Sequence, residues 1–182
     1  MKIGVVSDTH GSITAWQKAF SLLSDCQLII HCGDVLYHGP RNPLPEGYQP
    51  QELVGALNAM TIPMVYAKGN CDADVDQMLL EYPIEAPYVH LILDGIRILV
   101  HHGHQFDEET IPAKLIRDNG LVISGHTHLP GIRQKGETVF LNPGSPALPK
   151  NTPKVPTAAK IIDRRIEIID LNDGSVIQSI RM

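Results

Sequence analysis

The first half of the chain alternates short apolar runs with apolar residues at helical spacing. Apolar runs over 2–7 and 27–32 predict two buried strands, and the apolar positions between them recur with the period of a helix. Further along, the pattern predicts a helix over 51–60, a strand over 64–68 and a short helix over 73–80. Each predicted strand ends at a polar residue. This alternation is typical of an α/β sheet.

From residue 88 the apolar period changes from 3.6 to 2. Runs over 89–93 and 96–100 flank Asp94-Gly95, which is a strong signal for a two-residue hairpin turn. A helix over 111–118 and a buried strand over 121–124 follow. The remaining β-rich runs are separated by turns at Gly136, Arg164-Arg165 and Asp173-Gly174. The whole pattern predicts two sheets packed together with helices outside them.

The segment 35–50 interrupts this regular pattern. It contains Pro40, Pro43, Pro45 and Pro50 among glycines and polar residues, so regular structure is not expected there. Loops of this length in small domains are usually functional.

Composition restricts the class of protein. With 182 residues, of which 43% are apolar and 19% charged, the chain is expected to fold as one compact domain. A net charge of −5 without a run of Lys or Arg disfavours general binding to long nucleic acid or anionic lipid. Three cysteines at unrelated spacings, no signal segment and no apolar stretch of ~20 residues lead us to expect a soluble cytoplasmic protein.

Five predicted strand ends carry polar clusters. They are Asp8-Thr9-His10, Gly33-Asp34, Gly69-Asn70-Cys71-Asp72, His102-Gly103-His104 and Gly125-His126-Thr127-His128. Ligands of open α/β sheets gather at the carboxyl ends of strands, so these clusters are expected to converge. Because residues two apart in an extended segment point the same way, Asp8 with His10, and His126 with His128, are each expected to aim at one spot.

The residue types in these clusters indicate a metal site. Imidazole and carboxylate together suit Mn, Fe, Co, Ni and Zn better than Mg or Ca. Seven candidate ligands exceed the needs of one tetrahedral ion and suit a pair of ions about 3.5–4 Å apart that share a carboxylate through its two oxygens. With two carboxylates and a bridging hydroxide, such a pair keeps a net charge of about +1, which would select a phosphate anion.

The order of these clusters, followed by Asn142-Pro143-Gly144-Ser145, resembles the pattern of the calcineurin-like metallophosphoesterase superfamily, and the resemblance covers the whole chain. Segments 33–48 and 74–80 resemble a bacterial phosphodiesterase branch of that superfamily. The resemblance implies a single domain over 1–182 with an α/β (α+β) fold, a four-layer αββα sandwich of two packed mixed β-sheets flanked by helices. It also implies two divalent metal ions, Mn by preference, although the ligands would accept Zn, Co, Ni or Fe.

The family pattern assigns the ligands to the two ions. One ion is assigned to Asp8, His10, Asp34 and His128, and the other to Asp34, Asn70, His102 and His126, so that Asp34 bridges them. Where many members of the superfamily have a His after the ligand Asn, this chain has Cys71 followed by Asp72. Cys71 is either a weak proton donor partnered by Asp72 or a small filler beside the ions.

Three further residues are candidates for contacts with the substrate. His104 lies beside His102 without a ligand position of its own, and is expected to contact a phosphate oxygen or the leaving group. His38 and Arg41 in the long loop are either substrate contacts or solvated loop residues. Ser145 has no paired His and Asp, so its segment is interpreted as a turn near the site.

These observations predict a metal-dependent phosphodiesterase that acts on a small phosphodiester by in-line attack of a hydroxide bridging two ions. A weak proton donor favours diesters over monoesters, but a phosphomonoesterase of the same fold is an alternative. A non-catalytic protein-binding scaffold, resembling the retromer subunit of this fold, is another.

Other folds explain the sequence less well. A metallo-β-lactamase box over 102–107 has its Asp one place late, and a TIM barrel needs about 250 residues. The β-rich C-terminal region and the long loop offer edges and surfaces for a homo-oligomer.

Overall fold

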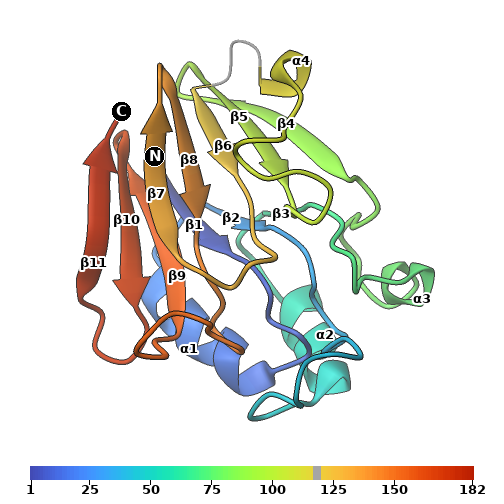
Figure 1. Cartoon of the computed structure of the whole chain (residues 1–182). Helices are drawn as coiled ribbons and strands as arrows, with labels where there is room; N and C mark the ends of the chain where they lie inside the picture. The colour runs from blue at the N-terminus through green and yellow to red at the C-terminus, as the bar shows by residue number, and fades with distance from the viewer. Residues whose placement is uncertain (117–119) are drawn as a thin grey trace.

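The computed structural model of the protein describes residues 1–116 and 120–182 and contains two β-sheets (Figure 1). The larger sheet has the order β11-β10-β9-β1-β2-β3, formed by β1 (Lys2–Val6), β2 (Leu28–His31), β3 (Met64–Tyr66), β9 (Thr157–Ile162), β10 (Arg165–Asp170) and β11 (Val176–Arg181). The smaller sheet has the order β4-β5-β6-β8-β7, formed by β4 (Tyr88–Leu93), β5 (Ile96–His101), β6 (Leu121–Ile123), β7 (Gly131–Lys135) and β8 (Thr138–Asn142). Both sheets mix parallel and antiparallel pairs.

Helices α1 (Ile13–Leu23) and α2 (Pro50–Asn58) lie against the outer face of the larger sheet (Figure 1). Ser12 caps α1 by accepting a hydrogen bond from the backbone N–H of Ala15, and the helix buries Trp16 and Leu23. Pro50 opens α2 at a position where its missing N–H leaves no hydrogen bond unmade. These helices form the first layer of the sandwich.

Three apolar clusters define the other layers. One lies between the helices and the larger sheet, and the second fills the space between the two sheets with residues such as Val5, Ile30 and Ile123. The third covers the outer face of the smaller sheet, where Ile111 and neighbouring side chains pack on it. The order of layers is therefore helix, sheet, sheet and a thin outer layer that contains α4 (Ala113–Ile116).

Most predicted elements are confirmed. Asp94 and Gly95 both have positive φ, as a type I′ turn between β4 and β5 requires. Segment 35–49 forms no helix or strand, apart from an isolated bridge between Tyr48 and Ser12. No helix formed by the described residues has the length and apolar character to cross a membrane.

Two predicted helices differ from their expected bounds. The helix predicted over 73–80 is reduced to α3 (Asp74–Gln77), whose start is capped by the side chain of Asp76. Met78 and Leu79, which follow it, are exposed and bury no apolar face that would extend the helix. Of the helix predicted over 111–118, the described residues show α4 from Ala113 onward, and the predicted positions 117 and 118 lie outside the described residues. Helix α3 is short enough that tertiary packing, rather than helix propensity, determines its extent.

Candidate metal centre

The five polar clusters converge at one edge of the sandwich. Asp8 and His10 follow β1, Asp34 follows β2 and Asn70 follows β3 in the larger sheet. His102 follows β5, and His126 and His128 follow β6, in the smaller sheet. The site is therefore built across both sheets, and the predicted convergence at strand ends is observed.

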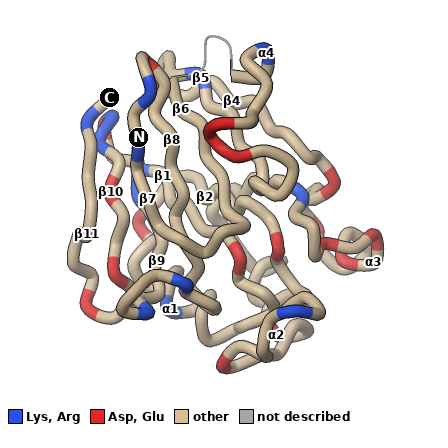
Figure 2. The backbone as a smooth tube through the Cα atoms, in the orientation of Figure 1, with Lys and Arg blue, Asp and Glu red and all other residues tan. Residues whose placement is uncertain are grey.

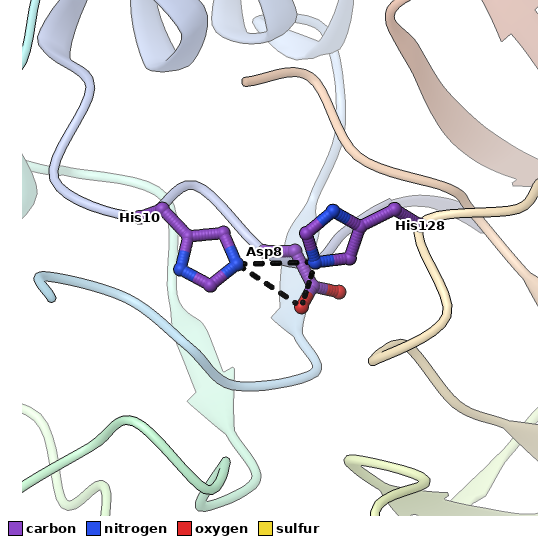
Figure 3. A group of neighbouring side chains, drawn as sticks. All are labelled: Asp8, His10 and His128. Carbon is purple, nitrogen blue, oxygen red and sulfur yellow. Dashed lines mark hydrogen bonds and ion pairs between the residues drawn. The ribbon is translucent and has the colours of Figure 1, made fainter. Parts of the chain in front are cut away.

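Asp8, His10 and His128 form the first group of potential ligands (Figure 3). The Oδ1 atom of Asp8 lies 3.2 Å from Nε2 of His128 and 3.6 Å from Nε2 of His10. The two Nε2 atoms are 3.1 Å apart. All three side chains are buried, so three ligand atoms face one another in a space with little water.

Asp34, His102 and His126 form the second group, and Asn70 joins it. Nε2 of His102 lies 3.4 Å from Oδ2 of Asp34 and 3.1 Å from Oδ1 of Asn70. The amide oxygen of Asn70 is a neutral ligand, so it adds coordination without adding negative charge.

Asp34 connects the two groups through a single oxygen atom. Its Oδ2 lies within 3.9 Å of Nε2 of His10 and 3.4 Å of Nε2 of His102. Its other oxygen, Oδ1, accepts a hydrogen bond from the backbone N–H of Cys71 at 2.8 Å. The sequence analysis assigned one carboxylate oxygen to each ion, and the geometry instead directs Oδ2 toward both groups.

The histidine rings are oriented by backbone carbonyls on their far side. Nδ1 of His10 is 2.8 Å from the carbonyl oxygen of Tyr37, Nδ1 of His102 is 2.8 Å from that of Cys32, and Nδ1 of His128 is 2.7 Å from that of Leu148. A carbonyl oxygen only accepts, so each Nδ1 carries the proton and donates it. Nε2 is then the ring atom that faces the cluster in all three residues, and it is the atom available to bind a metal ion once it is free of a proton.

The residues present fit metal cations. In the described part of the chain, Oδ1 of Asp8 is buried with no hydrogen-bond partner. It faces the Nε2 lone pairs of His10 and His128, and three acceptors at this separation repel one another unless a proton or a cation lies among them. Histidine nitrogens and carboxylate oxygens are the usual donor set of first-row divalent ions, and here the rings of His10, His102 and His128 are each held by a second hydrogen bond.

The charges of the site also favour the binding of metal cations. Burial would raise the pKa of Asp8, but the adjacent imidazoles of His10 and His128, together with His102, hold that pKa well below its usual range. Burial would lower the pKa of His102, but the carboxylates of Asp34 and Asp8 outweigh it and raise the pKa to about 9. The two carboxylates are thus negative at neutral pH and attract positive charge.

Most of the ligand residues have a left-handed backbone. Positive φ angles occur at Asp8 (58°), His10 (48°), Asp34 (57°), His126 (68°) and His128 (60°). The sequence analysis assumed extended segments, and that assumption was wrong, because the chain turns through left-handed residues as it leaves β1, β2 and β6. Non-glycine residues adopt this conformation at a cost, and such strain concentrates at functional sites.

The tight backbone also separates two residues that were expected to point together. His128 lies with Asp8 and His10 in the first group, whereas His126 lies with Asp34 and His102 in the second. The alternation rule therefore failed for His126 and His128, while the expected pairing of Asp8 with His10 is observed. The assignment implied by the family resemblance had already placed the two histidines on different ions.

Two serines support Asp8 and were not predicted to do so. The Ser7 hydroxyl donates to Oδ2 of Asp8 at 2.6 Å, and the backbone N–H of His126 donates to the same oxygen at 2.9 Å. The Ser145 hydroxyl donates to the backbone carbonyl of Asp8 at 2.8 Å and accepts from the N–H of Leu148. The Asn-Pro-Gly-Ser motif was the available signal, and its turn does lie beside the site.

Asp72 and Cys71 hold the loops around the site. The buried carboxylate of Asp72 accepts hydrogen bonds from the backbone N–H groups of Asp34, Val35 and Gly69 at 2.7–2.9 Å. Both of its oxygens are thereby engaged with the backbone, which indicates a positioning role. Burial, reinforced by Asp34, raises the pKa of the Cys71 thiol to about 12, so the thiol remains protonated.

The predicted substrate residues lie on two segments of the chain. The exposed ring of His104 is centred 5.5 Å from His102 and 6.2 Å from His126, so it stands at the rim of the second group. His38 packs edge-on against Tyr37 and Tyr48 in the long loop. Arg41 is exposed on the same loop.

Comparison with known proteins decides the family. The model of the calcineurin-like phosphoesterase superfamily domain matches residues 1–163. This chain belongs to that superfamily. Phosphodiesterase YfcE of Escherichia coli K12 is 41% identical over 183 residues, which cover 99% of this chain and 97% of YfcE. A probable metallophosphoesterase of Methanothermobacter thermautotrophicus is 32% identical over 162 residues, covering 84% and 81%.

Comparison with solved structures shows independently that this chain has the calcineurin-like phosphoesterase fold. The structure of YfcE, described as a phosphoesterase from E. coli, superposes with a TM-score of 0.92 at 40% identity and covers 100% of this chain and 99% of YfcE. Vacuolar Protein Sorting 29 from Cryptosporidium parvum superposes with a TM-score of 0.69 at 18% identity, covering 100% and 98%. The second likeness shows the fold alone. The predicted fold class is confirmed.

Proposed function

We propose that this protein is a phosphodiesterase that depends on two divalent metal ions. The observation that carries the proposal is Oδ2 of Asp34, which faces ligand groups on both sides. Asp8, His10 and His128 would hold one ion, and Asn70, His102 and His126 the other. The similarity to phosphodiesterase YfcE supports hydrolysis of a diester bond.

The ions, when bound, would lower the pKa of water and neutralise charge on the phosphate. The protein contributes the rest of the chemistry through rigid positioning. Carbonyl oxygens orient the imidazoles of His10, His102 and His128, and Ser7 and Ser145 fix Asp8. A site held in this way needs little reorganisation when the substrate arrives.

His104 is the proposed contact to the phosphate or the leaving group. Partial desolvation, together with the nearby His102, lowers the pKa of His104, so its ring is neutral at pH 7 and donates one N–H. Cys71 retains its proton at neutral pH because its pKa is about 12. Neither group is a strong acid, so the enzyme favours diesters with acidic leaving groups over monoesters.

The proposed substrate is a small phosphodiester rather than a long nucleic acid. Lys and Arg residues are scattered along the chain among acidic ones, and the net charge is −5 (Figure 2). Manganese is the proposed ion, with Zn, Co, Ni and Fe as competitors for the same ligands.

The first experiment uses metal-stripped protein to which Mn is returned. Bis(4-nitrophenyl) phosphate should be cleaved faster than 4-nitrophenyl phosphate, only with metal, and not by Asp34→Asn. Faster cleavage of the monoester would instead identify a phosphomonoesterase. Two bound ions without turnover of either ester would favour a protein-binding scaffold.

A further inference from the structure

An apolar hollow of about 330 Å³ lies beside the metal centre. Its walls come from the long loop, from α2 and from the segment around α3. Tyr37 and Tyr48 line it on the loop side, Val54 on the α2 side, and Leu79 on the α3 side. None of these side chains belongs to the ligand set.

Cys71 connects the hollow to the metal centre. Its side chain lines the hollow, and its Sγ lies within 4.8 Å of ligand atoms of His10 and Asp34. The loop also joins the two regions, because the carbonyl oxygen of Tyr37 orients His10 while the ring of Tyr37 lines the hollow. A group attached to a phosphate at the metal centre therefore has an adjoining space to enter.

The wall chemistry defines what fits. Among the lining residues, Asp76 is the one with a charged side chain, and it is occupied as the cap of α3 through the N–H of Ala73. The lining contains no Lys or Arg, so a second phosphate or a carboxylate would find no counter-charge there. Apolar walls of this kind bind neutral hydrocarbon or aromatic groups.

The volume of the hollow and the exposure of its rim also suit an apolar ligand group. A protein cavity of about 150 Å³ holds one benzene molecule, so a hollow of about 330 Å³ has room for a substituted ring. Tyr37, Val75 and Leu79 are 42%, 56% and 50% exposed at its rim. Large apolar side chains gathered in the open in this way usually mark a binding site.

We propose that this hollow binds an uncharged aromatic or branched aliphatic ester group of the substrate. The inference rests on the proposed function and narrows it, because the enzyme would then select phosphodiesters in which one alcohol is bulky, apolar and neutral. Val54 and Leu79 determine this preference, and Cys71 forms the wall shared with the metal centre.

Two inert phosphonates test the proposal on the Mn-loaded protein. Phenylphosphonate and methylphosphonate carry the same head group, and only the first carries a ring. Calorimetric titration should show phenylphosphonate binding about tenfold more tightly than methylphosphonate, the gain expected from burying part of one aromatic ring. In the Zn-loaded protein, whose ion does not broaden nearby signals as paramagnetic Mn would, the amide NMR signals of 73–79 and of Val54 should shift with phenylphosphonate alone.

Matched variants test whether the ring of phenylphosphonate binds in the hollow. Val54→Phe fills the hollow and Leu79→Gln makes its rim polar, and each should reduce the phenyl preference to under about twofold. Met78→Gln is the control, because Met78 neighbours Leu79, is 83% exposed and does not line the hollow. Leu79 is itself half-exposed, so its substitution should leave the fold intact.

The outcomes separate the two proposals. Equal affinities for the two phosphonates, or a phenyl preference that survives both hollow variants, overturn the assignment of the hollow. Dissociation of an oligomer by Leu79→Gln with the phenyl preference unchanged also overturns it, in favour of a contact between copies. A phenyl preference without turnover of any diester overturns the proposed phosphodiesterase and leaves the binding site standing.

Discussion

The backbone N–H of Cys71 donates to Oδ1 of Asp34 and leaves Oδ2 of the same carboxylate facing both groups of ligands. This relationship makes Asp34 intolerant of its closest substitute. In Asp34→Asn, one of the two positions must become an amide NH₂. That NH₂ faces either the N–H of Cys71 or the metal centre, and neither accepts a donor.

Asp34→Asn should therefore lose about 10³-fold or more in turnover of bis(4-nitrophenyl) phosphate. Atomic absorption should find fewer bound ions per chain in the variant than in the parent. Asp25→Asn serves as the control and should keep parental activity, because Asp25 is an exposed carboxylate that pairs with Lys2 and Lys160 and with none of the ligand residues. Retention of both ions and of activity by Asp34→Asn would show that the shared oxygen is dispensable.

Metal affinity should rise with pH. Burial lowers the pKa of His102, but the carboxylates of Asp34 and Asp8 raise it to about 9, so the metal-free protein carries a proton on that ring at pH 7. A metal ion must displace this proton, which makes binding weaker as pH falls below about 9. Mn titrations at pH 6, 7 and 8 should give tighter binding at each step. Affinity that is independent of pH would contradict the protonated metal-free state.

Removal of metal should lower thermal stability. An ion that binds only the folded chain stabilises it by about 2.7 kcal/mol when present at 100 times its Kd. Differential scanning calorimetry should show a lower Tm after chelation, restored by Mn. In His128→Ala, which lacks a ligand of the first group, the restoration should be smaller. An unchanged Tm in the parent protein would contradict metal binding to the folded state.

His104 and Cys71 should differ in importance. His104→Ala removes a neutral N–H donor at the rim and should lower kcat by about 10²-fold. Cys71→Ser keeps a small group whose proton stays in place at neutral pH, so kcat should change by less than about threefold. Steady-state kinetics with bis(4-nitrophenyl) phosphate separate the two. A larger loss in Cys71→Ser than in His104→Ala would reverse these roles.

Ser145 should act on stability and on metal binding together. Its hydroxyl donates to the carbonyl of Asp8 and accepts two backbone N–H groups, from Ala147 and Leu148. Ser145→Ala leaves these buried groups unpaired and should lower the free energy of unfolding by about 1–3 kcal/mol. Mn affinity should fall about tenfold, because Asp8 is less well positioned. Ser21→Ala on the exposed face of α1 is the control for urea denaturation and Mn titration.

Asp25 provides a pH-dependent contribution to stability away from the site. Hydrogen bonds from Lys160 and Lys2 lower the pKa of Asp25 to about 2. A carboxylate whose pKa is depressed on folding stabilises the protein above its unfolded pKa and loses that effect as pH falls through the folded value. Asp25 is 50% exposed, so Asp25→Asn should destabilise by only about 0.5 kcal/mol at pH 7. In urea denaturation the difference should shrink between about pH 4 and pH 2 and vanish in 1 M salt at pH 7.

The strands and the position of the site could be predicted because both depend on local patterns. Apolar runs that end at Asp8, Asp34 and Asn70 specify buried strands with ligands at their carboxyl ends. Hairpin residues such as Asp94 and Gly95 specify their turn through backbone conformation alone. The family resemblance added the division of ligands between two groups.

Tertiary details could not be predicted in the same way. The left-handed backbone at His126 and His128 is imposed by the packing of the strand ends. The rule that side chains two residues apart point the same way holds only for extended backbone, so it could not predict this conformation. The partners of Asp72 are backbone N–H groups from two separate loops, which no spacing in the sequence reveals. The hollow beside Cys71 likewise depends on three segments that meet only in the folded chain.

The facing Nε2 atoms of His10 and His128 have a further consequence for how the chain folds. These residues are 118 positions apart, and they leave strands of different sheets. An ion held by both closes that long loop and fastens one sheet to the other, in the manner of a removable cross-link. The effect of the bound ion on the unfolding rate therefore indicates whether the two sheets dock before or after the folding transition state. Stopped-flow unfolding with and without Mn would measure this effect.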